Sequence, residues 1–185
     1  MRKLLIIFIL LTGIAKGQTT WDQIAIRQTY GTAVLMDTTG LGSLASSATV
    51  GRQTAKVSNL ATLANDYEIF VKFTFANTAP GSDKTLYLFV CPFYTTDGGT
   101  TWFATDQGTT TLPTGAVAAS TIASPNSLVL LGAIPYTTQQ MVCQKSFLLS
   151  NAFGNRIPDG FSLIVINFTG AALSTVNLIY YTPLN

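Results

Sequence analysis

The spacing of apolar residues between positions 67 and 183 constrains the fold more than any other feature of this chain. In the stretch YEIFVKFTF, apolar side chains occupy every second position, namely Ile69, Val71, Phe73 and Phe75. This period is typical of a β-strand with one buried face, because successive side chains of a strand point to opposite sides. The sequence therefore predicts a strand at 67–75, and no stretch has a long helical period with a capping box.

Five further apolar runs are separated by residues that favour turns. The run LYLFVCPFY is almost continuously apolar, which predicts a central strand that ends or bulges at Pro92. Four more strands are predicted in SLVLLGAIP, QMVCQKSFLL, GFSLIVINF and VNLIYYTP. Turn signals stand at Asp97-Gly98-Gly99, 135–137, 154–160 and 169–170. About eight strands with such turns predict an all-β chain, a two-sheet β-sandwich that is jelly-roll-like.

Weaker patterning elsewhere predicts short strands and loops. Short strands are expected around 24–26 and 34–36, and the Gly/Ser/Ala-rich segment 40–49 is expected to be a loop. That segment is either an ordinary surface loop or an arm that wraps a neighbouring subunit. A long surface excursion is expected at 104–124. The chain thus divides into 1–17, an N-terminal arm with short strands at 18–50, and a β-sandwich domain at 51–185.

The first 17 residues have the layout of a secretory signal. A short basic start precedes the apolar run 4–15, and the small residues Ala15 and Gly17 come just before Gln18. The run is shorter than the roughly 20 apolar residues that a membrane-spanning helix needs. We expect a cleaved signal peptide, with an uncleaved membrane or virion anchor as the alternative. The expected location is extracellular or on a virion surface.

The charge balance argues against a nucleic-acid partner. Three of the 10 basic residues, Arg2, Lys3 and Lys16, lie in the signal-like segment, which leaves seven against 8 acidic residues. Nucleic-acid-binding proteins concentrate Lys and Arg on one face, whereas the remaining basic residues are sparse and scattered here. Only 10% of residues are charged, against about a quarter in an average soluble domain. A surface of Thr, Ser, Asn and Gln is typical of extracellular β proteins and of capsid-like surfaces.

The chain lacks most of the usual catalytic groups. It contains no histidine, which excludes Ser-His-Asp and Cys-His arrangements and the commonest metal ligand. Glu68 is its one glutamate, and turn formation explains Asp97 and Asp159 better than acid–base chemistry does. No calcium-binding loop of the EF-hand kind and no phosphate-binding glycine motif is present. We therefore expect no enzyme activity, no catalytic residue, no metal and no cofactor.

The two cysteines, Cys91 and Cys143, fall inside predicted strands. They can form one disulfide in an oxidising compartment if their strands are neighbours. The alternative is two buried thiols in an apolar core, which the sequence favours slightly.

Aromatic residues are the remaining candidates for a binding site. Tyr94 and Trp102 flank the predicted turn at Asp97, and rings on a loop can stack on the apolar faces of sugars. We take Tyr94, Asp97 and Trp102 as weak ligand-binding candidates. The alternative is that Trp102 covers an open end of the core, and this is the interpretation that the sequence favours.

An ordered series of motifs resembles a known group of viral proteins. The series runs GRQTAKVSNL, YEIFVKFTF, SLVLLGAIP and SFLLSNAFGNRIPDGFSLIVINFTGAAL, and it spans 51–181. It is similar to small β-rich proteins of tailed-phage and environmental-virus genomes, in which a GRQ start, an LLG.IP strand and a TGAAL ending recur. This chain departs at Phe161, where a tryptophan is common, and in its signal-like start. The resemblance implies a virion accessory protein, such as a capsid-decoration, head-fibre or tail-associated subunit.

Two functions are therefore expected from different classes. The first is a non-enzymatic virion accessory subunit that forms a homo-oligomer and contacts virion or capsid proteins. The second is a secreted bacterial adhesin or carbohydrate-binding module that recognises surface glycans. An enzyme that uses a pair of aspartates is the third and least favoured alternative.

Overall fold

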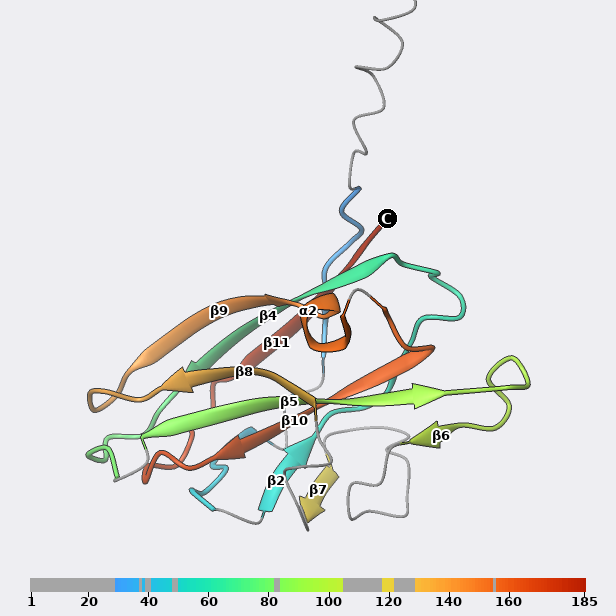
Figure 1. Cartoon of the computed structure of the whole chain (residues 1–185). Helices are drawn as coiled ribbons and strands as arrows, with labels where there is room; N and C mark the ends of the chain where they lie inside the picture. Colours follow the sequence, from blue (N-terminus) through green and yellow to red (C-terminus); the bar gives the residue numbers. More distant parts are fainter. Residues whose placement is uncertain are drawn as a thin grey trace, which may run out of the picture.

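The computed structural model describes residues 29–36, 38, 41–47, 50–81, 84–104, 118–121, 129–154 and 156–185. The expected signal at 1–17, the strand around 24–26 and most of the excursion at 104–124 lie outside these residues. The described chain forms two antiparallel sheets that pack face to face (Figure 1). The predicted all-β, two-sheet sandwich is thus confirmed.

The upper sheet in Figure 1 has four strands and the lower sheet has seven. The four-stranded sheet has the order β1 (Val34–Leu35), β11 (Leu178–Leu184), β4 (Asp66–Thr74) and β9 (Val142–Leu148). The main path of the seven-stranded sheet is β6 (Phe103–Ala104), β5 (Thr85–Tyr94), β10 (Gly160–Asn167), β2 (Val50–Gln53) and β7 (Ala118–Thr121). Off this path, β3 (Val57–Ser58) pairs with β10 and β8 (Val129–Pro135) pairs with β5. A four-residue helix, α2 (Ser150–Phe153), follows β9.

The number of strands was underestimated because the missed strands are short. β3 and β6 have two residues each, and β2 and β7 have four. A run of two to four residues is too short to show a period of two, and such strands are defined by their pairing instead. The six longer strands lie where the apolar runs predicted them.

The main core fills the space between the two sheets. Alternate residues of β4, β5 and β10 contribute buried side chains to it: Tyr67, Ile69, Val71 and Phe73; Leu86, Leu88 and Val90; Phe161, Leu163 and Val165. The alternation of apolar residues in YEIFVKFTF therefore arises, as predicted, because one face of β4 is buried in the core. The opposite face of β4 carries Glu68, Phe70 and Lys72, which are only partly buried.

A second apolar layer lies on the other face of the seven-stranded sheet. It consists of the buried residues Phe89, Cys91, Phe93, Ile164 and Ile166, with Tyr87, Trp102 and Phe168 packed against them. All eight residues of β10 are consequently buried. The nearly continuous apolar runs of β5 and β10 reflect burial on both faces, a pattern that is more usual in parallel sheets than in antiparallel ones such as this.

β5 does not end at Pro92, and this corrects the prediction. The strand continues to Tyr94, and its irregularity lies between Leu88 and Phe89, opposite β8. β8 pairs with β5 only as far as Val90, and β6 begins to pair at Phe93. Among the described strands, Pro92 therefore has a neighbour only on the β10 side, which is the kind of position at which a sheet tolerates proline.

The loop within 40–49 packs on its own sandwich. Leu41 and Leu44 are buried in the main core. The backbone N–H of Ser47 donates to the carbonyl of Asn167 at 2.7 Å, and that of Leu173 donates to the carbonyl of Leu44 at 3.0 Å. The described part of this loop therefore covers the core of its own chain.

Two predicted turns depend on glycine in the left-handed region. Gly98 and Gly99 have φ of 69° and 96° in the turn before β6, and Gly170 has φ of 80° in the turn after β10. A Cβ at Gly170 would stand 2.5 Å from the Cα of Gly81, so this position also requires a close backbone approach.

In the described part of the chain, no helix has the length and apolarity needed to span a bilayer.

Candidate ligand-binding site

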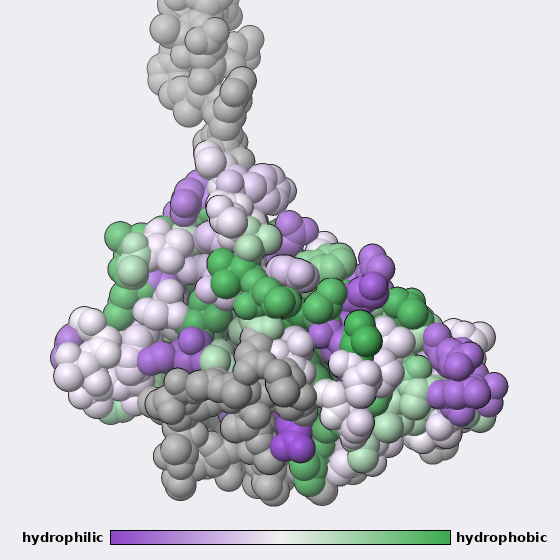
Figure 2. Space-filling model, turned by 180° about the vertical axis from the view of Figure 1, so that it is seen from behind, coloured by the Kyte–Doolittle hydropathy of each residue, from purple (hydrophilic) through white to green (hydrophobic). Residues whose placement is uncertain are grey.

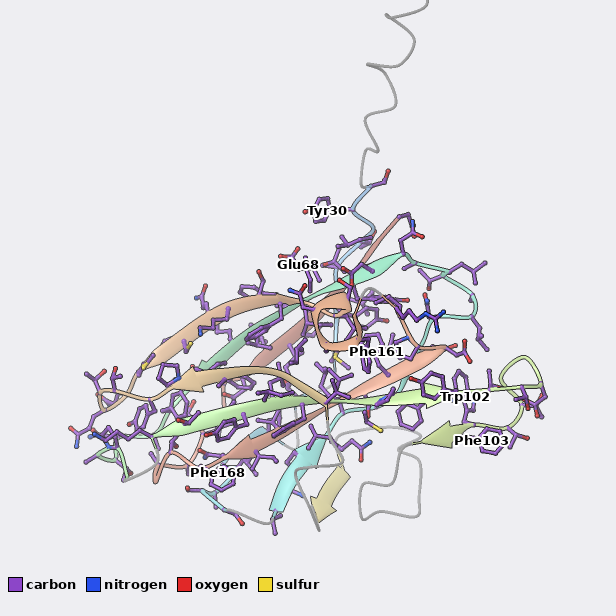
Figure 3. All side chains as sticks on the ribbon, viewed as in Figure 1. Tyr30, Glu68, Trp102, Phe103, Phe161 and Phe168 are labelled. Carbon is purple, nitrogen blue, oxygen red and sulfur yellow. The ribbon has the colours of Figure 1, made fainter. Side chains whose placement is uncertain are left out.

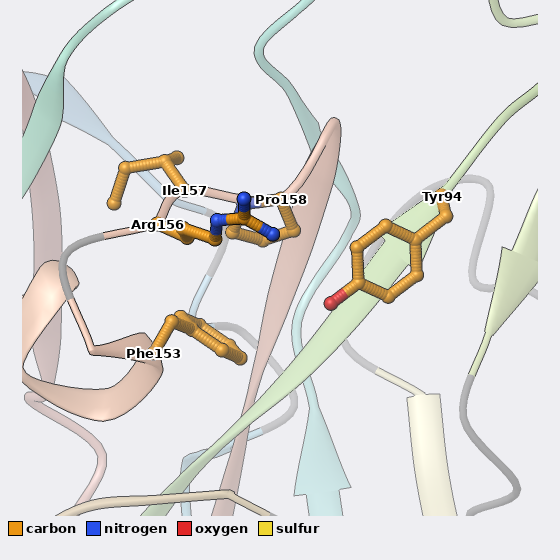
Figure 4. Close-up of a pocket in the computed structure, with 5 residues that line it drawn as sticks. All are labelled: Tyr94, Phe153, Arg156, Ile157 and Pro158. Atoms are coloured by element: carbon orange, nitrogen blue, oxygen red, sulfur yellow. The ribbon is translucent and has the colours of Figure 1, made fainter.

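A pocket of about 410 Å³ opens at one end of the sandwich. It is lined by Tyr94 at the end of β5, Phe153 at the end of α2, and Arg156, Ile157 and Pro158 in the segment that leads to β10. Figure 4 shows the Arg156 guanidinium and the Phe153 ring on one side and the Tyr94 ring on the other. The phenolic oxygen of Tyr94 is directed toward the space between them.

A hydrogen-bonded aspartate joins the two walls of this pocket. The Asp159 carboxylate accepts a hydrogen bond from the backbone N–H of Thr95 at 2.9 Å, and the Asp159 carbonyl accepts one from the N–H of Asn59 at 2.8 Å. Thr95 directly follows Tyr94, and Asp159 directly follows Pro158. Asp159 therefore fixes the segment 156–158 beside the end of β5 through a bond to a residue 64 positions earlier in the chain, and not through the local turn bonding that the sequence predicted for it.

A glycine starts the other wall. Gly154 ends α2 in the left-handed conformation with φ of 61°, and its N–H donates to the carbonyl of Ser150. A residue in this conformation after a helix is a common C-terminal cap, and glycine adopts it without a steric cost. The chain is thereby redirected from Phe153 toward Arg156, so that the two side chains line the same pocket.

The pocket combines rings, one cation and an apolar floor. Tyr94 is 48% exposed and Arg156 is exposed, whereas Pro158 is buried. A guanidinium binds a carboxylate through two parallel hydrogen bonds, and the phenol and phenyl rings offer faces for stacking. None of the five lining residues is a carboxylate, thiol or imidazole. The arrangement is suited to holding a ring-shaped ligand that bears a carboxylate.

Trp102 lies outside this pocket. Its ring packs against the second apolar layer, and the Lys56 ammonium stands 3.4 Å from the ring centroid. Burial lowers the pKa of Lys56. A Cβ on Gly160 would be 3.0 Å from the ring, so the tryptophan also packs closely on the start of β10 (Figure 3). The ring face toward Lys56 is thus already occupied by a cation.

Asp97 also lies outside the pocket, because its carboxylate holds the turn before β6. Its Oδ1 accepts hydrogen bonds at 2.8 Å from the backbone N–H of Thr101 and from the hydroxyl of Thr95. The bonds from Thr101, then the bond from Thr95, hold the pKa of Asp97 at about 2, below its ordinary value of 3.8. Of the three candidates predicted from the sequence, the structure brings only Tyr94 into the pocket.

Replacing Asp97 with asparagine is expected to reduce the loss of stability at acid pH. Because the pKa is lower in the folded state, ionised Asp97 stabilises the turn above about pH 4, and this contribution is lost as the pH falls toward 2. The melting temperature should therefore fall less from pH 4 to pH 2 in Asp97→Asn than in the wild type. The effect should be small, since the carboxylate is fully exposed. If the melting temperature falls equally in both proteins between pH 4 and pH 2, the hydrogen bonds to Asp97 do not form in solution.

No disulfide joins Cys91 and Cys143, so the disulfide considered from the sequence is absent from this structure. Cys91 lies in β5 and belongs to the second apolar layer, whereas Cys143 lies in β9 and belongs to the main core. The two strands belong to different sheets and are not neighbours. Burial raises the pKa of Cys143. Among the described residues, no group of three His, Cys, Asp or Glu side chains could hold a metal ion.

Sequence reasoning missed four of the five residues that line the pocket. Arg156, Ile157 and Pro158 lie in the predicted turn at 154–160 and Phe153 directly precedes it, and the sequence assigned none of them to a site. The sequence signal that could have indicated a binding site here is Arg156, a single charged residue that is not a typical turn former. Its proximity to Tyr94, 62 positions earlier in the chain, depends on the pairing of β5 with β10.

No known protein family matches this chain, and no curated protein matches it either.

Proposed function

We propose that this protein is a non-enzymatic virion accessory subunit, of the capsid-decoration or head-fibre kind. The observation that carries the proposal is that β5 and β10 pack on both faces, and that the pocket is lined by no carboxylate, thiol or imidazole. The motif series from 51 to 181 and the low proportion of charged residues support the same class of function. Figure 2 shows hydrophobic residues at the surface across the middle of one face, with hydrophilic residues beside them.

Copy number in purified particles tests this proposal. Quantitative mass spectrometry on particles purified through a density gradient is expected to find the protein in a fixed ratio to the major capsid protein. Such a ratio follows from symmetric assembly, in which each equivalent site takes one subunit. Absence from particles, with recovery only from the culture supernatant, would reject the proposal.

The pocket favours a second candidate function, a secreted adhesin or carbohydrate-binding module. Tyr94 and Phe153 offer ring faces for a sugar, and Arg156 offers a partner for a carboxylate. The ligand class on this account is a saccharide that contains a uronic or sialic acid. A virion subunit can use the same pocket to bind a host surface, so the two functions differ in where the protein resides.

Replacing Tyr94 with alanine is expected to weaken binding to an acidic saccharide about tenfold, the upper range for one ring contact. Arg156→Gln should weaken binding to carboxylated saccharides and leave their neutral counterparts unaffected. A glycan array followed by titration calorimetry measures both effects. Tyr30→Ala is the matched control, because Tyr30 is 63% exposed and does not line the pocket. Binding that survives both pocket substitutions, or no binding by the wild type, would exclude this function.

A further inference from the structure

The outer face of the four-stranded sheet carries an ordered set of side chains. We define this face by the residues that alternate with the buried ones: Leu35 on β1; Leu178, Tyr180 and Thr182 on β11; Glu68, Phe70 and Lys72 on β4; and Gln144, Ser146 and Leu148 on β9. The strand register places Leu35, Tyr180, Phe70 and Ser146 in one row across the sheet. The rows on either side contain Glu68 and Lys72, respectively.

The centre of this face is apolar and accessible. The rings of Phe70 and Tyr180 are 6.4 Å apart and partly buried, and Leu35 and Leu148 are 51% and 39% exposed. Figure 3 shows Glu68 at the top of the molecule, on the side of β4 away from the seven-stranded sheet. Aromatic residues of this kind are enriched at the centres of protein interfaces.

Two opposite charges flank this centre symmetrically. Glu68 precedes Phe70 by two residues and Lys72 follows it by two, so the three side chains stand in line along β4. Consider a second copy rotated by 180° about an axis that lies in the interface and runs across the strands at Phe70. The rotation reverses β4, so Glu68 of each copy stands over Lys72 of the other while the Phe70 row stands over itself. The charges on this face are therefore complementary to those of an identical face.

We propose that the outer face binds the same face of a second copy as a two-fold symmetric dimer. Phe70 and Tyr180 form its centre, and two Glu68–Lys72 pairs flank them. An isologous interface requires this self-complementarity, because each residue must meet its own symmetry partner. The inference deepens the self-association that the proposed virion function expects, and it names the surface that carries it.

The β9 edge of the same sheet is unsuited to joining two copies. β9 is an edge strand, and Lys145 lies opposite Val71, on the face that carries the core. Its ammonium donates a hydrogen bond to the carbonyl of Ala133 at 3.2 Å. A lysine directed inward at an edge strand opposes the addition of a further strand. Association through the sheet face is therefore favoured over extension of the sheet at β9.

Charge reversal tests this interface. Sedimentation velocity of the wild type over a range of concentrations is expected to show a dimer that weakens in high salt. Glu68→Lys and Lys72→Glu each place like charges over one another, so each should raise the dissociation constant at least tenfold. The double variant exchanges the two charges within each copy, so opposite charges again stand over one another and the wild-type dissociation constant should be restored. Lys84→Glu is the control, because this exposed lysine lies outside the face.

Each outcome of this experiment bears on the interface directly. The proposed interface would be overturned if the wild type is a monomer, or if the single charge reversals leave the dissociation constant unchanged. It would also be overturned if the double variant dimerises as weakly as the single variants. Circular dichroism and the melting temperature establish that each variant is folded, and every side chain that is replaced is partly buried or exposed. A monomer that is nevertheless found in purified particles would reject the dimer and leave the proposed function standing.

Discussion

Replacing Asn167 with leucine is expected to lower the free energy of unfolding by about 4 kcal/mol, with a fall in melting temperature of roughly 10 °C. Asn167 is fully buried at the end of β10. Its Nδ2 donates to the carbonyls of Leu44 and Ala171 at 3.0 and 2.7 Å, and its Oδ1 accepts from the N–H and hydroxyl of Thr169 at 3.1 and 2.6 Å. Leucine keeps the branching and the number of side-chain heavy atoms but can form none of these hydrogen bonds, so its two larger methyl groups leave the buried partners of Asn167 unsatisfied.

The control for Asn167→Leu is the same substitution at an exposed asparagine. Asn77→Leu is the control, because Asn77 is exposed in the loop after β4, and its melting temperature should stay close to that of the wild type. Thermal unfolding followed by circular dichroism measures both. If Asn167→Leu and Asn77→Leu unfold at the same temperature, Asn167 does not tie the loops at 44 and 171 to β10.

Truncating Phe161 to alanine is expected to lower the free energy of unfolding by about 3–5 kcal/mol, because it leaves a cavity in the main core. Phe161 is fully buried, and its ring lies 5.1 Å from that of Tyr67 and 6.4 Å from that of Tyr181 (Figure 3). It thus joins β10 of the seven-stranded sheet to β4 and β11 of the four-stranded sheet. Chemical denaturation with urea measures the difference.

The matched control for this change is Phe103→Ala. Phe103 is 54% exposed on β6, so its truncation removes little packing and should change the free energy of unfolding by less than about 1 kcal/mol. An equally small effect of Phe161→Ala would mean that the two sheets do not pack together at this end.

The sequence predicted the long strands because their side chains carry a readable period. The alternation at Ile69, Val71 and Phe73 indicated one buried face, and the structure confirms it. The continuous apolar runs of β5 and β10 indicated central strands, and the structure adds the reason, a second apolar layer that contains Ile164 and Ile166. The spacing of apolar residues indicates whether one or both faces of a strand are buried, but it does not predict which residues cover those faces.

The candidate site was less accessible to sequence reasoning. Tyr94 was identified because an aromatic ring next to a turn is conspicuous, whereas Arg156 reaches the same pocket only through the antiparallel pairing of β5 with β10. Trp102 is more conspicuous than either residue, yet its ring packs against the second apolar layer and beneath Lys56. Strand order determines which distant loops meet, and strand order is not encoded in local spacing.

β10 lies between two apolar layers, so among the described residues the pocket and the outer face of the four-stranded sheet are the candidate functional surfaces. Native-state hydrogen exchange along the chain tests this claim most directly, because amides in the most buried strands open only with the whole fold. The account predicts that Gly160–Asn167 and the facing amides of β5 exchange most slowly, well behind those of the edge strand β9. Exchange in β10 as fast as that in β9 would contradict it.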